Sequence, residues 1–322
     1  MENRKLNGIG LEVSRACFGT MTFGAQASPE ASSRMVDVCL DAGINFFDTA
    51  NVYNKGASES ILGRALGKRR SRVVLASKVA GKMGDDPLAS GLSKAAILRA
   101  VEASLSRLGT DYLDIYYLHQ PDYSVPLEET LEAMEELVRS GKVRQPASSN
   151  YASWQVCRML WIADRNGYTP LKVTQPMYNL LARGIEQEYL PMAKELGVST
   201  VVYNPLAGGL LTGKQRRGEP LPGTRFDNNR LYLDRYWHEA QFDAIEELAG
   251  AARAAGRSLV SLALNWVLHH TAADCLILGA SRIEQLQENL RALGDGPLAP
   301  ETLAVCDAVW RKLRGVAPQY NR

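Results

Sequence analysis

Four side chains in the first half of the chain are of types that together carry out acid–base chemistry: Asp48, Tyr53, Lys78 and His119. We call these four the tetrad. A phenol is a poor acid near neutral pH unless a neighbouring cation stabilises the phenolate left after proton donation. Lys78 can supply that cation, and Asp48 can hold its ammonium group. A ring nitrogen of His119 can orient an oxygen on which negative charge develops. The set suits the reduction of a carbonyl.

Three members of the tetrad end short apolar segments that are typical of buried strands. These segments are residues 44–47 with Asp48, 73–77 with Lys78 and 112–118 with His119. Tyr53 lies in the loop beyond the first of them. In a parallel β/α barrel the carboxyl ends of all strands open on one face, which would bring the tetrad together. Any one member alone could be a polar residue solvated at the rim, but four in consecutive units favour a site.

The rest of the chain alternates in the same way between strand-like segments and stretches with helical periodicity. The further strand segments are residues 16–20, a segment that ends at Asn150, and residues 171–175, 198–204 and 275–279. Ser28 and Pro29 fit the cap and the first position of a helix. Eight such units predict a (β/α)8 TIM barrel, an α/β fold whose usual length fits one domain spanning residues 1–322.

Two segments depart from simple alternation. Residues 208–238 are rich in Gly, Pro and Arg and predict a long loop after the seventh strand. Such a loop is either a lid or a surface excursion without ligand contact, and the sequence favours neither. Residues 301–313 have amphipathic periodicity and predict an extra C-terminal helix.

Composition argues against several other classes of protein. The 37 basic and 35 acidic residues leave a formal charge of +2, too balanced for binding nucleic acid through bulk charge. No apolar run of the sequence is long enough to span a membrane, so we expect a cytoplasmic location. The five cysteines form no Cys-x-x-Cys pair and the four histidines have no His-x-x-x-His spacing. We therefore expect reduced thiols and no catalytic metal.

Several blocks of the sequence resemble the aldo-keto reductase superfamily. They are LDAGINFFDTANVY at residues 40–53, the strand that ends at Lys78, YYLHQPD at residues 116–122, and the blocks at 19–21, 206–210 and 279–282. They follow the family's order and approximate spacing over nearly the whole chain. The resemblance implies a reductase that binds NADPH without a Rossmann fold, delivers hydride from the nicotinamide, and protonates the carbonyl oxygen through Tyr53.

The resemblance also implies which residues hold NADPH. Those near the nicotinamide would be Ser149, Asn150, Gln175 and Tyr203, and those near the pyrophosphate Leu206, Gly208, Leu210 and Lys214. Those near the adenosine end would be Gly279, Ser281, Arg282, Gln285, Glu288 and Asn289. The remaining expected contacts are Gly19, Thr20, Met21, Asp48 and Asn204. Because Arg282 and Ser281 suit a 2′-phosphate, NADPH is expected over NADH. Ordinary helix capping is the alternative for this last block.

One segment departs from the family's pattern. Relatives usually carry an aromatic residue, an aliphatic residue and a glycine where this chain has Gln145, Pro146 and Ala147. Proline has no N–H to donate within a barrel strand. We predict a local bulge or a missing hydrogen bond near Pro146, which would shift Ser149 and Asn150 and loosen nicotinamide binding.

The function expected from these features is NADPH-dependent reduction of aldehydes or ketones. The partner would be a small-molecule carbonyl substrate, with no nucleic acid and no membrane, and a homo-oligomer is left open. A second hypothesis is an NADPH-binding regulatory subunit with little turnover, resembling the potassium-channel β subunits of the superfamily. A third is a barrel lyase or isomerase without nicotinamide. The intact tetrad favours the reductase.

Overall fold

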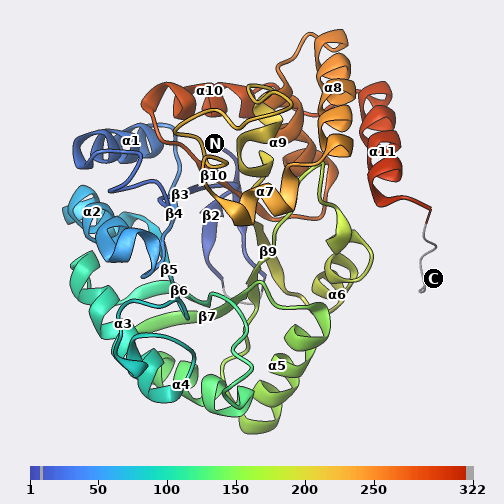
Figure 1. Cartoon of the computed structure of the whole chain (residues 1–322). Coiled ribbons are helices and arrows are strands. Elements are labelled where there is room, and N and C mark those ends of the chain that lie inside the picture. The colour runs from blue at the N-terminus through green and yellow to red at the C-terminus, as the bar shows by residue number, and fades with distance from the viewer. Residues whose placement is uncertain (8–9, 317–322) are drawn as a thin grey trace.

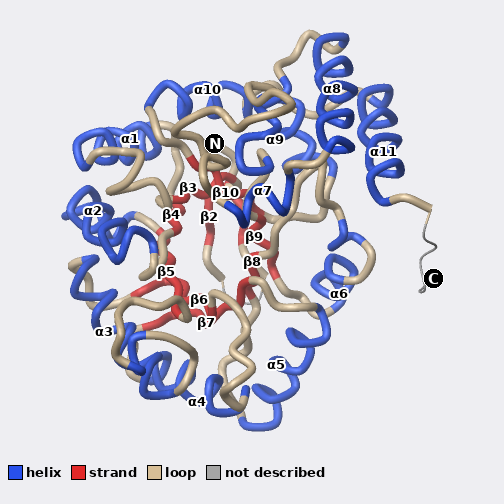
Figure 2. Tube along the Cα trace, in the orientation of Figure 1, coloured by secondary structure: helices blue, strands red, loops and turns tan. Residues whose placement is uncertain are grey.

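The computed structural model describes residues 1–7 and 10–316. In this part of the chain eight parallel strands close into a barrel in the order β10-β3-β4-β5-β6-β7-β8-β9. The strands are β3 (Ala16–Gly19), β4 (Phe46–Asp48), β5 (Val74–Val79), β6 (Leu113–Leu118), β7 (Val143–Ser149), β8 (Val173–Gln175), β9 (Ser199–Val202) and β10 (Cys275–Gly279). They form the inner ring in Figure 2. The predicted (β/α)8 TIM barrel is confirmed.

Helices surround this ring on the outside (Figure 1). The described helices are α1 (Pro29–Asp41), α2 (Ala57–Leu66), α3 (Lys94–Leu108), α4 (Leu127–Arg139), α5 (Ser153–Asn166), α6 (Tyr189–Glu195), α7 (Arg230–Tyr236), α8 (Glu239–Ala254), α9 (Leu259–His270), α10 (Ile283–Leu293) and α11 (Pro300–Arg314). The predicted cap of the first helix is confirmed, because the Ser28 hydroxyl accepts a hydrogen bond from Ala31 N and Pro29 opens α1. The extra C-terminal helix is α11, which packs on α8.

Alternation along each strand divides the apolar side chains between two cores. Phe46, Ala76 and Tyr117 belong to the cluster that fills the barrel. Their neighbours Phe47 and Leu75 belong to the larger cluster between strands and helices. The same alternation turns Ser77 outward and Lys78 inward on β5, since Ala76 lies in the inner cluster and Val79 in the outer one. Strand register thus decides which polar side chains reach the barrel mouth.

An N-terminal hairpin, which the sequence did not reveal, closes the amino end of the barrel. It pairs β1 (Asn3–Lys5) with β2 (Glu12–Ser14). Leu6 and Val13 of this hairpin are buried in the inner cluster. Ser14 N donates to Asn45 Oδ1 at 2.7 Å, just before β4. The hairpin therefore lies at the end of the barrel opposite the strand ends that carry the tetrad.

The segment predicted as a long loop contains a helix, so that prediction is wrong for residues 230–236. These residues form α7, capped by the Asn229 side chain, which accepts from Tyr232 N. The Tyr236 hydroxyl accepts hydrogen bonds from Asn179 Nδ2 at 2.9 Å and Asn204 Nδ2 at 3.0 Å, beyond the carboxyl ends of β8 and β9. Figure 1 shows α7 inside the ring of outer helices. The segment thus lies over the barrel mouth, as a lid would.

The predicted bulge at Pro146 is wrong. Strand β7 keeps the same register with β6 on both sides of this residue, since Gln145 pairs with Ile115 and Ala147 with Tyr117. Pairing of β7 with β8 begins at Ala147, so the proline lies just before the second ladder rather than inside it. The proline therefore shifts the register of neither ladder, and Ser149 keeps its pairing with Gln175.

Candidate active site

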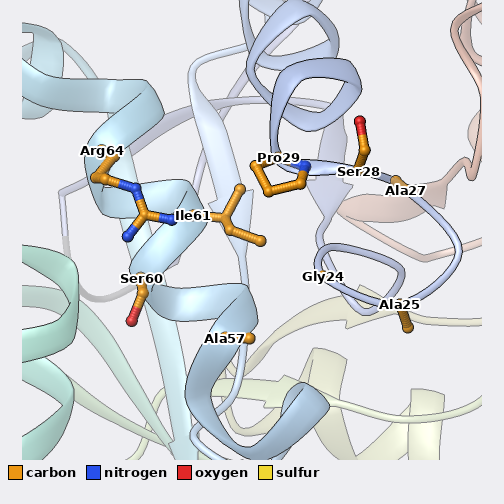
Figure 3. A pocket seen from close by; sticks show the side chains of 9 residues that line it. All are labelled: Gly24, Ala25, Ala27, Ser28, Pro29, Ala57, Ser60, Ile61 and Arg64. Atoms are coloured by element: carbon orange, nitrogen blue, oxygen red, sulfur yellow. The ribbon is translucent and has the colours of Figure 1, made fainter.

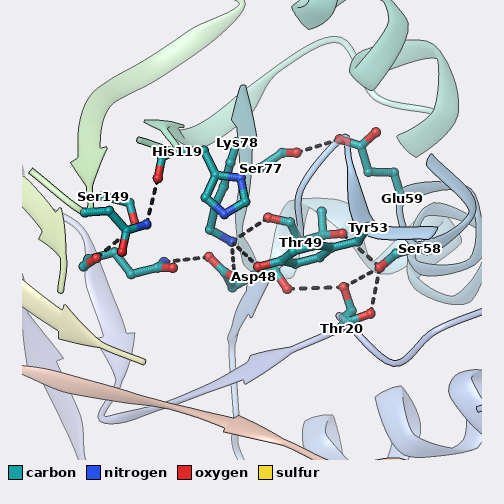
Figure 4. Close-up of polar contacts among 12 residues, drawn as sticks. Thr20, Asp48, Thr49, Tyr53, Ser58, Glu59, Ser77, Lys78, His119 and Ser149 are labelled. Carbon is teal, nitrogen blue, oxygen red and sulfur yellow. Dashed lines mark hydrogen bonds and ion pairs between the residues drawn. The ribbon is translucent and has the colours of Figure 1, made fainter. Parts of the chain in front are cut away.

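Three members of the tetrad meet at the carboxyl ends of β4 and β5 (Figure 4). The Lys78 side chain is fully buried, and its Nζ forms an ion pair with Asp48 Oδ1. The same ammonium donates to Thr49 O at 2.8 Å and to Tyr53 Oη at 3.3 Å. Each of its three N–H bonds therefore has an acceptor, and one of these acceptors is the phenol.

Electrostatics keep Lys78 charged despite its burial. Burial acts to lower the pKa of Lys78, but the negative charge of Asp48 and the hydrogen bonds that Lys78 makes to Asp48 and Tyr53 raise it above its ordinary value overall. Burial also raises the pKa of Tyr53, and Lys78 opposes that rise. The pair at neutral pH is therefore an ammonium group and a protonated phenol, with the cation stabilising the phenolate that proton donation would leave.

His119 follows β6 and packs its ring edge-to-face on Tyr53, with the ring centroids 5.9 Å apart. Burial and the nearby charge of Lys78 lower the pKa of His119 to about 3. The imidazole is therefore neutral at physiological pH, with one ring nitrogen as donor and the other as acceptor. A neutral donor beside Tyr53 can orient a carbonyl oxygen without competing with the phenol as the acid.

The residues expected around the nicotinamide form a connected polar group beside the tetrad. Gln175 Nε2 donates to Asp48 Oδ2 at 2.8 Å, and Ser149 Oγ donates to Gln175 O at 2.9 Å. Asn150 has a left-handed φ of 62° and donates from Nδ2 to His119 O at 2.8 Å. Tyr203 Oη donates to Asn150 Oδ1 at 2.7 Å. These contacts join the ends of β7, β8 and β9 to the tetrad.

The residues expected at the pyrophosphate follow β9, within or beside the 3₁₀ segment Ala207–Thr212. Gly208 has a φ of 70°, and its N donates to Asn204 Oδ1 at 2.7 Å. A Cβ on Gly208 would lie 2.8 Å from Tyr232 Cδ1, so only glycine permits this approach of α7. Leu210 is buried and Leu206 partly so. Lys214 is exposed, and its Nζ lies 3.6 Å from Glu288 Oε2 on α10.

The residues expected at the adenosine end lie where β10 passes into α10. Gly279 ends β10 and remains exposed. Ser281 donates from both N and Oγ to Gln285 Oε1, each at 3.0 Å, and Asn289 Nδ2 donates to Gly279 O at 3.4 Å. Arg282 is the exposed N-cap residue, and among described side chains none caps the first turn of α10. The N–H groups of that turn suit a phosphate, so the donor set fits a dinucleotide.

The expected contacts at the carboxyl end of β3 are Gly19, which ends the strand, and Thr20 and Met21, which follow it. A Cβ on Gly19 would lie 2.6 Å from Ile277 Cγ2, so this glycine allows close packing of β3 on β10. Thr20 is fully buried and its hydroxyl bonds with Asp48 O at 3.2 Å and Ser58 Oγ at 2.8 Å. Met21 is 41% exposed. The structure therefore places Thr20 behind the site, as a support for the Asp48 backbone.

Sequence reasoning missed several polar residues that support the tetrad. Ser58 and Glu59 on α2 are both fully buried, and Tyr232 on α7 is a buried phenol near Tyr53. The signal for the first two was their position in line with Leu62 on the apolar face of α2. The sequence offered no comparable signal for Tyr232, because its place depends on the path of the loop.

A hollow at the surface lies outside this site (Figure 3). It is lined by Pro29 at the start of α1 and by Ala57, Ile61 and Arg64 of α2, among others. Ser58, the neighbour of Ala57, instead bonds to the ends of β3 and β4. The hollow therefore belongs to the helix layer.

Over residues 1–7 and 10–316, no group of three metal-ligating side chains is assembled, and none of the helices could cross a membrane.

Comparison with known proteins shows the family to which this chain is related. The model of the Aldo/keto reductase family matches residues 15–311. The chain belongs to the aldo/keto reductase family. It is 37% identical over 322 residues to Aflatoxin B1 aldehyde reductase member 2 of Rattus norvegicus, covering 94% of this chain and 86% of that protein. It is 38% identical over 304 residues to Uncharacterized oxidoreductase YrpG of Bacillus subtilis (strain 168), covering 91% of each.

A third relative has a different kind of name. The chain is 35% identical over 305 residues to a Probable voltage-gated potassium channel subunit beta of Arabidopsis thaliana, covering 92% of this chain and 93% of that protein. The resemblance seen in the sequence is therefore confirmed. Membership in this family supports an oxidoreductase that acts on carbonyl compounds with a nicotinamide cofactor.

Proposed function

We propose that this aldo/keto reductase is an NADPH-dependent enzyme that reduces aldehydes or ketones to alcohols, with Tyr53 as the general acid. The observation that carries the proposal is the 3.3 Å hydrogen bond from Lys78 Nζ to Tyr53 Oη, with Lys78 paired to Asp48. A surface tyrosine would have no such buried cation. The proposal includes a single domain over residues 1–322 and a cytoplasmic location.

The chain's own residues perform the proton transfer in this proposal. Bound NADPH supplies the hydride that reduces the carbonyl carbon. Tyr53 Oη gives its proton to the carbonyl oxygen, and Lys78 stabilises the phenolate that remains. His119, neutral because of its lowered pKa, donates a hydrogen bond to the same oxygen and orients it. The reverse oxidation uses the same groups, with the Tyr53 phenolate as the base.

The proposed cofactor site follows the ends of the last four strands. Ser149, Asn150 and Gln175 would bind the amide of the nicotinamide, and the ring of Tyr203 would stack on it. The segment from Leu206 to Lys214 would bind the pyrophosphate. Ser281 and Arg282 would bind the 2′-phosphate at the first turn of α10. This contact would give the enzyme its preference for NADPH over NADH.

The test is turnover of 4-nitrobenzaldehyde with NADPH, followed by the loss of nicotinamide absorbance. The wild-type chain should consume NADPH, and Tyr53→Phe should abolish turnover while still binding NADPH, because the ring is kept and only the acid is lost. Equal turnover by wild type and Tyr53→Phe would remove the acid role of Tyr53.

The likeness to a potassium channel subunit beta supports a second candidate, an NADPH-binding regulatory subunit. That candidate predicts tight binding of NADPH, measured by quenching of tryptophan fluorescence, with no detectable consumption of NADPH by aldehydes or ketones. Turnover that depends on Tyr53 favours the reductase over the regulatory subunit.

A further inference from the structure

Tyr53 does not lie on a strand, so the barrel alone does not fix its position. It begins the 3₁₀ segment Tyr53–Gly56, which connects β4 to α2. The three residues after it have left-handed backbones, with φ of 49° at Asn54, 54° at Lys55 and 88° at Gly56. Where the phenol stands relative to Lys78 therefore depends on how both ends of this connection are held, at β4 and at the start of α2.

Ser58 holds the start of α2 to the ends of β3 and β4. Its hydroxyl donates to Thr20 O at 2.7 Å and lies 2.8 Å from Thr20 Oγ and 3.0 Å from Thr49 Oγ1. Thr49 follows Asp48 directly, and its carbonyl accepts from Lys78. One side of the connection is thus fixed to the Asp48 side of the ion pair.

Glu59 holds the same turn of α2 to β5, the strand that carries Lys78. The Glu59 side chain is fully buried, and its Oε1 accepts from Ser77 Oγ at 2.5 Å (Figure 4). Ser77 directly precedes Lys78 and faces outward where Lys78 faces inward. A fixed Ser77 therefore fixes the pleat of the strand at Lys78. Glu59 therefore links the first turn of α2, which follows the Tyr53 segment, directly to β5, the strand that carries Lys78.

Arg107 of α3 neutralises this buried carboxylate. Its Nε donates to Glu59 Oε2 at 2.6 Å, and its side chain is only 24% exposed. A Cβ on Gly56 would lie 2.7 Å from Arg107 Cδ, so the guanidinium group lies against the backbone that follows Tyr53. Arg107 thus touches the connection from outside while it holds Glu59 toward β5.

We propose that Glu59 is a positioning residue for carbonyl reduction, which locks the start of α2 onto β5 through Ser77, with Arg107 as its counter-ion, and so sets the separation of Tyr53 Oη and Lys78 Nζ. The proposal rests on the proposed function of the tetrad. A buried ion pair is weak as a source of stability, because apolar side chains of similar volume stabilise a helix–strand contact as well or better. Its directional hydrogen bonds do provide a fixed geometry.

The test compares Ser77→Ala and Glu59→Gln with a matched control, Asp114→Asn. Asp114 is also a buried carboxylate, 1% exposed, paired with Arg70 and Arg144 and accepting from Leu75 N of β5 at 2.9 Å. It lies near the amino end of β6 and bonds to the amino end of β5, away from Lys78. Ser77→Ala removes one hydroxyl and leaves the ion pair with Arg107 intact. It therefore tests the link from Glu59 to Ser77, which we call the lock, even if Glu59→Gln fails to fold.

The expected result for Ser77→Ala and Glu59→Gln is a fall in kcat of about tenfold to a hundredfold, as a displacement of about 1 Å would cause, with KM for NADPH nearly unchanged. A more distant Lys78 lowers the pKa of Tyr53 less. Reduction requires protonated Tyr53, so the alkaline limb of its pH profile should move to higher pH. Asp114→Asn should lose stability but keep the wild-type kcat and pH profile.

A second readout needs no turnover. The tyrosinate absorbance of each protein, minus that of the same protein carrying Tyr53→Phe, gives the pKa of Tyr53 directly. The groups that face Tyr53 are Lys78 from β5, Asp48 from β4, His119 after β6 and Tyr232 from α7, and the variants leave all four in place. The pKa of Tyr53 should rise in Ser77→Ala and stay constant in Asp114→Asn.

The two proposals fail in different ways. An inactive wild-type chain whose Tyr53 pKa still rises in Ser77→Ala would contradict the reductase function and support the lock. An active wild-type chain whose kcat and Tyr53 pKa are unchanged in Ser77→Ala would overturn the lock and leave the reductase in place. Equal shifts in Ser77→Ala and Asp114→Asn would also overturn it, since the effect would then follow from lost stability alone.

Discussion

The tetrad combines a charged lysine and a neutral histidine at one phenol. Lys78 keeps its proton because Asp48 and Tyr53 outweigh the effect of burial, and His119 loses its proton because burial and Lys78 act in the same direction. The two neighbours of Tyr53 therefore have separate parts: one stabilises negative charge on the phenol, and the other donates a hydrogen bond without being an acid at neutral pH.

Replacing Lys78 by Met should remove that cation with little change in volume. We expect kcat for reduction to fall by about 10²- to 10⁴-fold, since the phenol would become a much weaker acid. Steady-state kinetics with NADPH and 4-nitrobenzaldehyde measure this. Lys142→Met, which removes only a surface ion pair with Glu102, is the control and should keep wild-type rates. Comparable rates in both variants would contradict the role of Lys78.

The lowered pKa of His119 has a consequence for stability. The unfolded chain binds a proton on this residue below its ordinary pKa of 6.5, whereas the folded chain does so only near pH 3. Between these values the unfolded state holds more protons, so the free energy of unfolding should fall as pH falls from 6.5 toward 3. Urea unfolding across this range should show a shallower fall in His119→Asn. Identical slopes would show that His119 titrates normally.

At the scale of elements, each strand delivers one or two polar groups to the mouth, and the sequence predicted this well. Short apolar segments that end at Asp48, Lys78 and His119 are strong signals, because buried parallel strands are apolar on both faces. The hairpin β1–β2 was missed because its strands, residues 3–5 and 12–14, are mostly polar and pair only with each other. Elements of that kind are held by contacts that local patterns do not contain.

The supporting polar contacts could not be predicted for the same reason. Glu59 lies in line with Leu62 on the apolar face of α2, which hints at its burial, but nothing in the local pattern names the partner of its carboxylate. Its burial follows from Arg107, which lies on another helix. Likewise, the seven residues of α7 are too few to form a stable helix alone, and the contacts of Tyr236 with Asn179 and Asn204 hold them in place.

The first turn of α10 is the element expected to distinguish NADPH from NADH. Arg282→Ala should raise the Kd for NADPH by an amount corresponding to about 1 to 3 kcal/mol and leave NADH binding nearly unchanged, because only NADPH has the 2′-phosphate. Fluorescence titration with both cofactors measures this. Arg291→Ala, in the last turn of the same helix, should affect neither. An equal loss for both cofactors would refute recognition of the 2′-phosphate by Arg282.

At the scale of the whole molecule, the N-terminal hairpin and the tetrad lie at opposite ends of the barrel. The hairpin side chains Leu6 and Val13 fill the amino end, whereas the tetrad and the segment with α7 lie at the carboxyl end. This division is usual in β/α barrels and allows one end to change with little effect on the other.

Leu6→Ala should therefore reduce stability without changing the site. We expect a loss of about 2 to 5 kcal/mol in the free energy of unfolding, because the side chain is 1% exposed and its removal leaves a cavity. Leu231→Ala, at a position that is 61% exposed, should change it by less than about 0.5 kcal/mol. Chemical denaturation measures both. A fall in kcat of folded Leu6→Ala that matches the loss in Lys78→Met would contradict the separation of the two ends.

Closure of the barrel also bears on solubility. Every barrel strand has a hydrogen-bonded neighbour on each side, so within the described residues the only open sheet edges are those of the three-residue strands β1 and β2. The first of these carries Arg4 and Lys5, and charged side chains on a short edge oppose the addition of a strand from another molecule. Aggregation of this protein should therefore begin from opened or partly folded chains rather than from the native barrel.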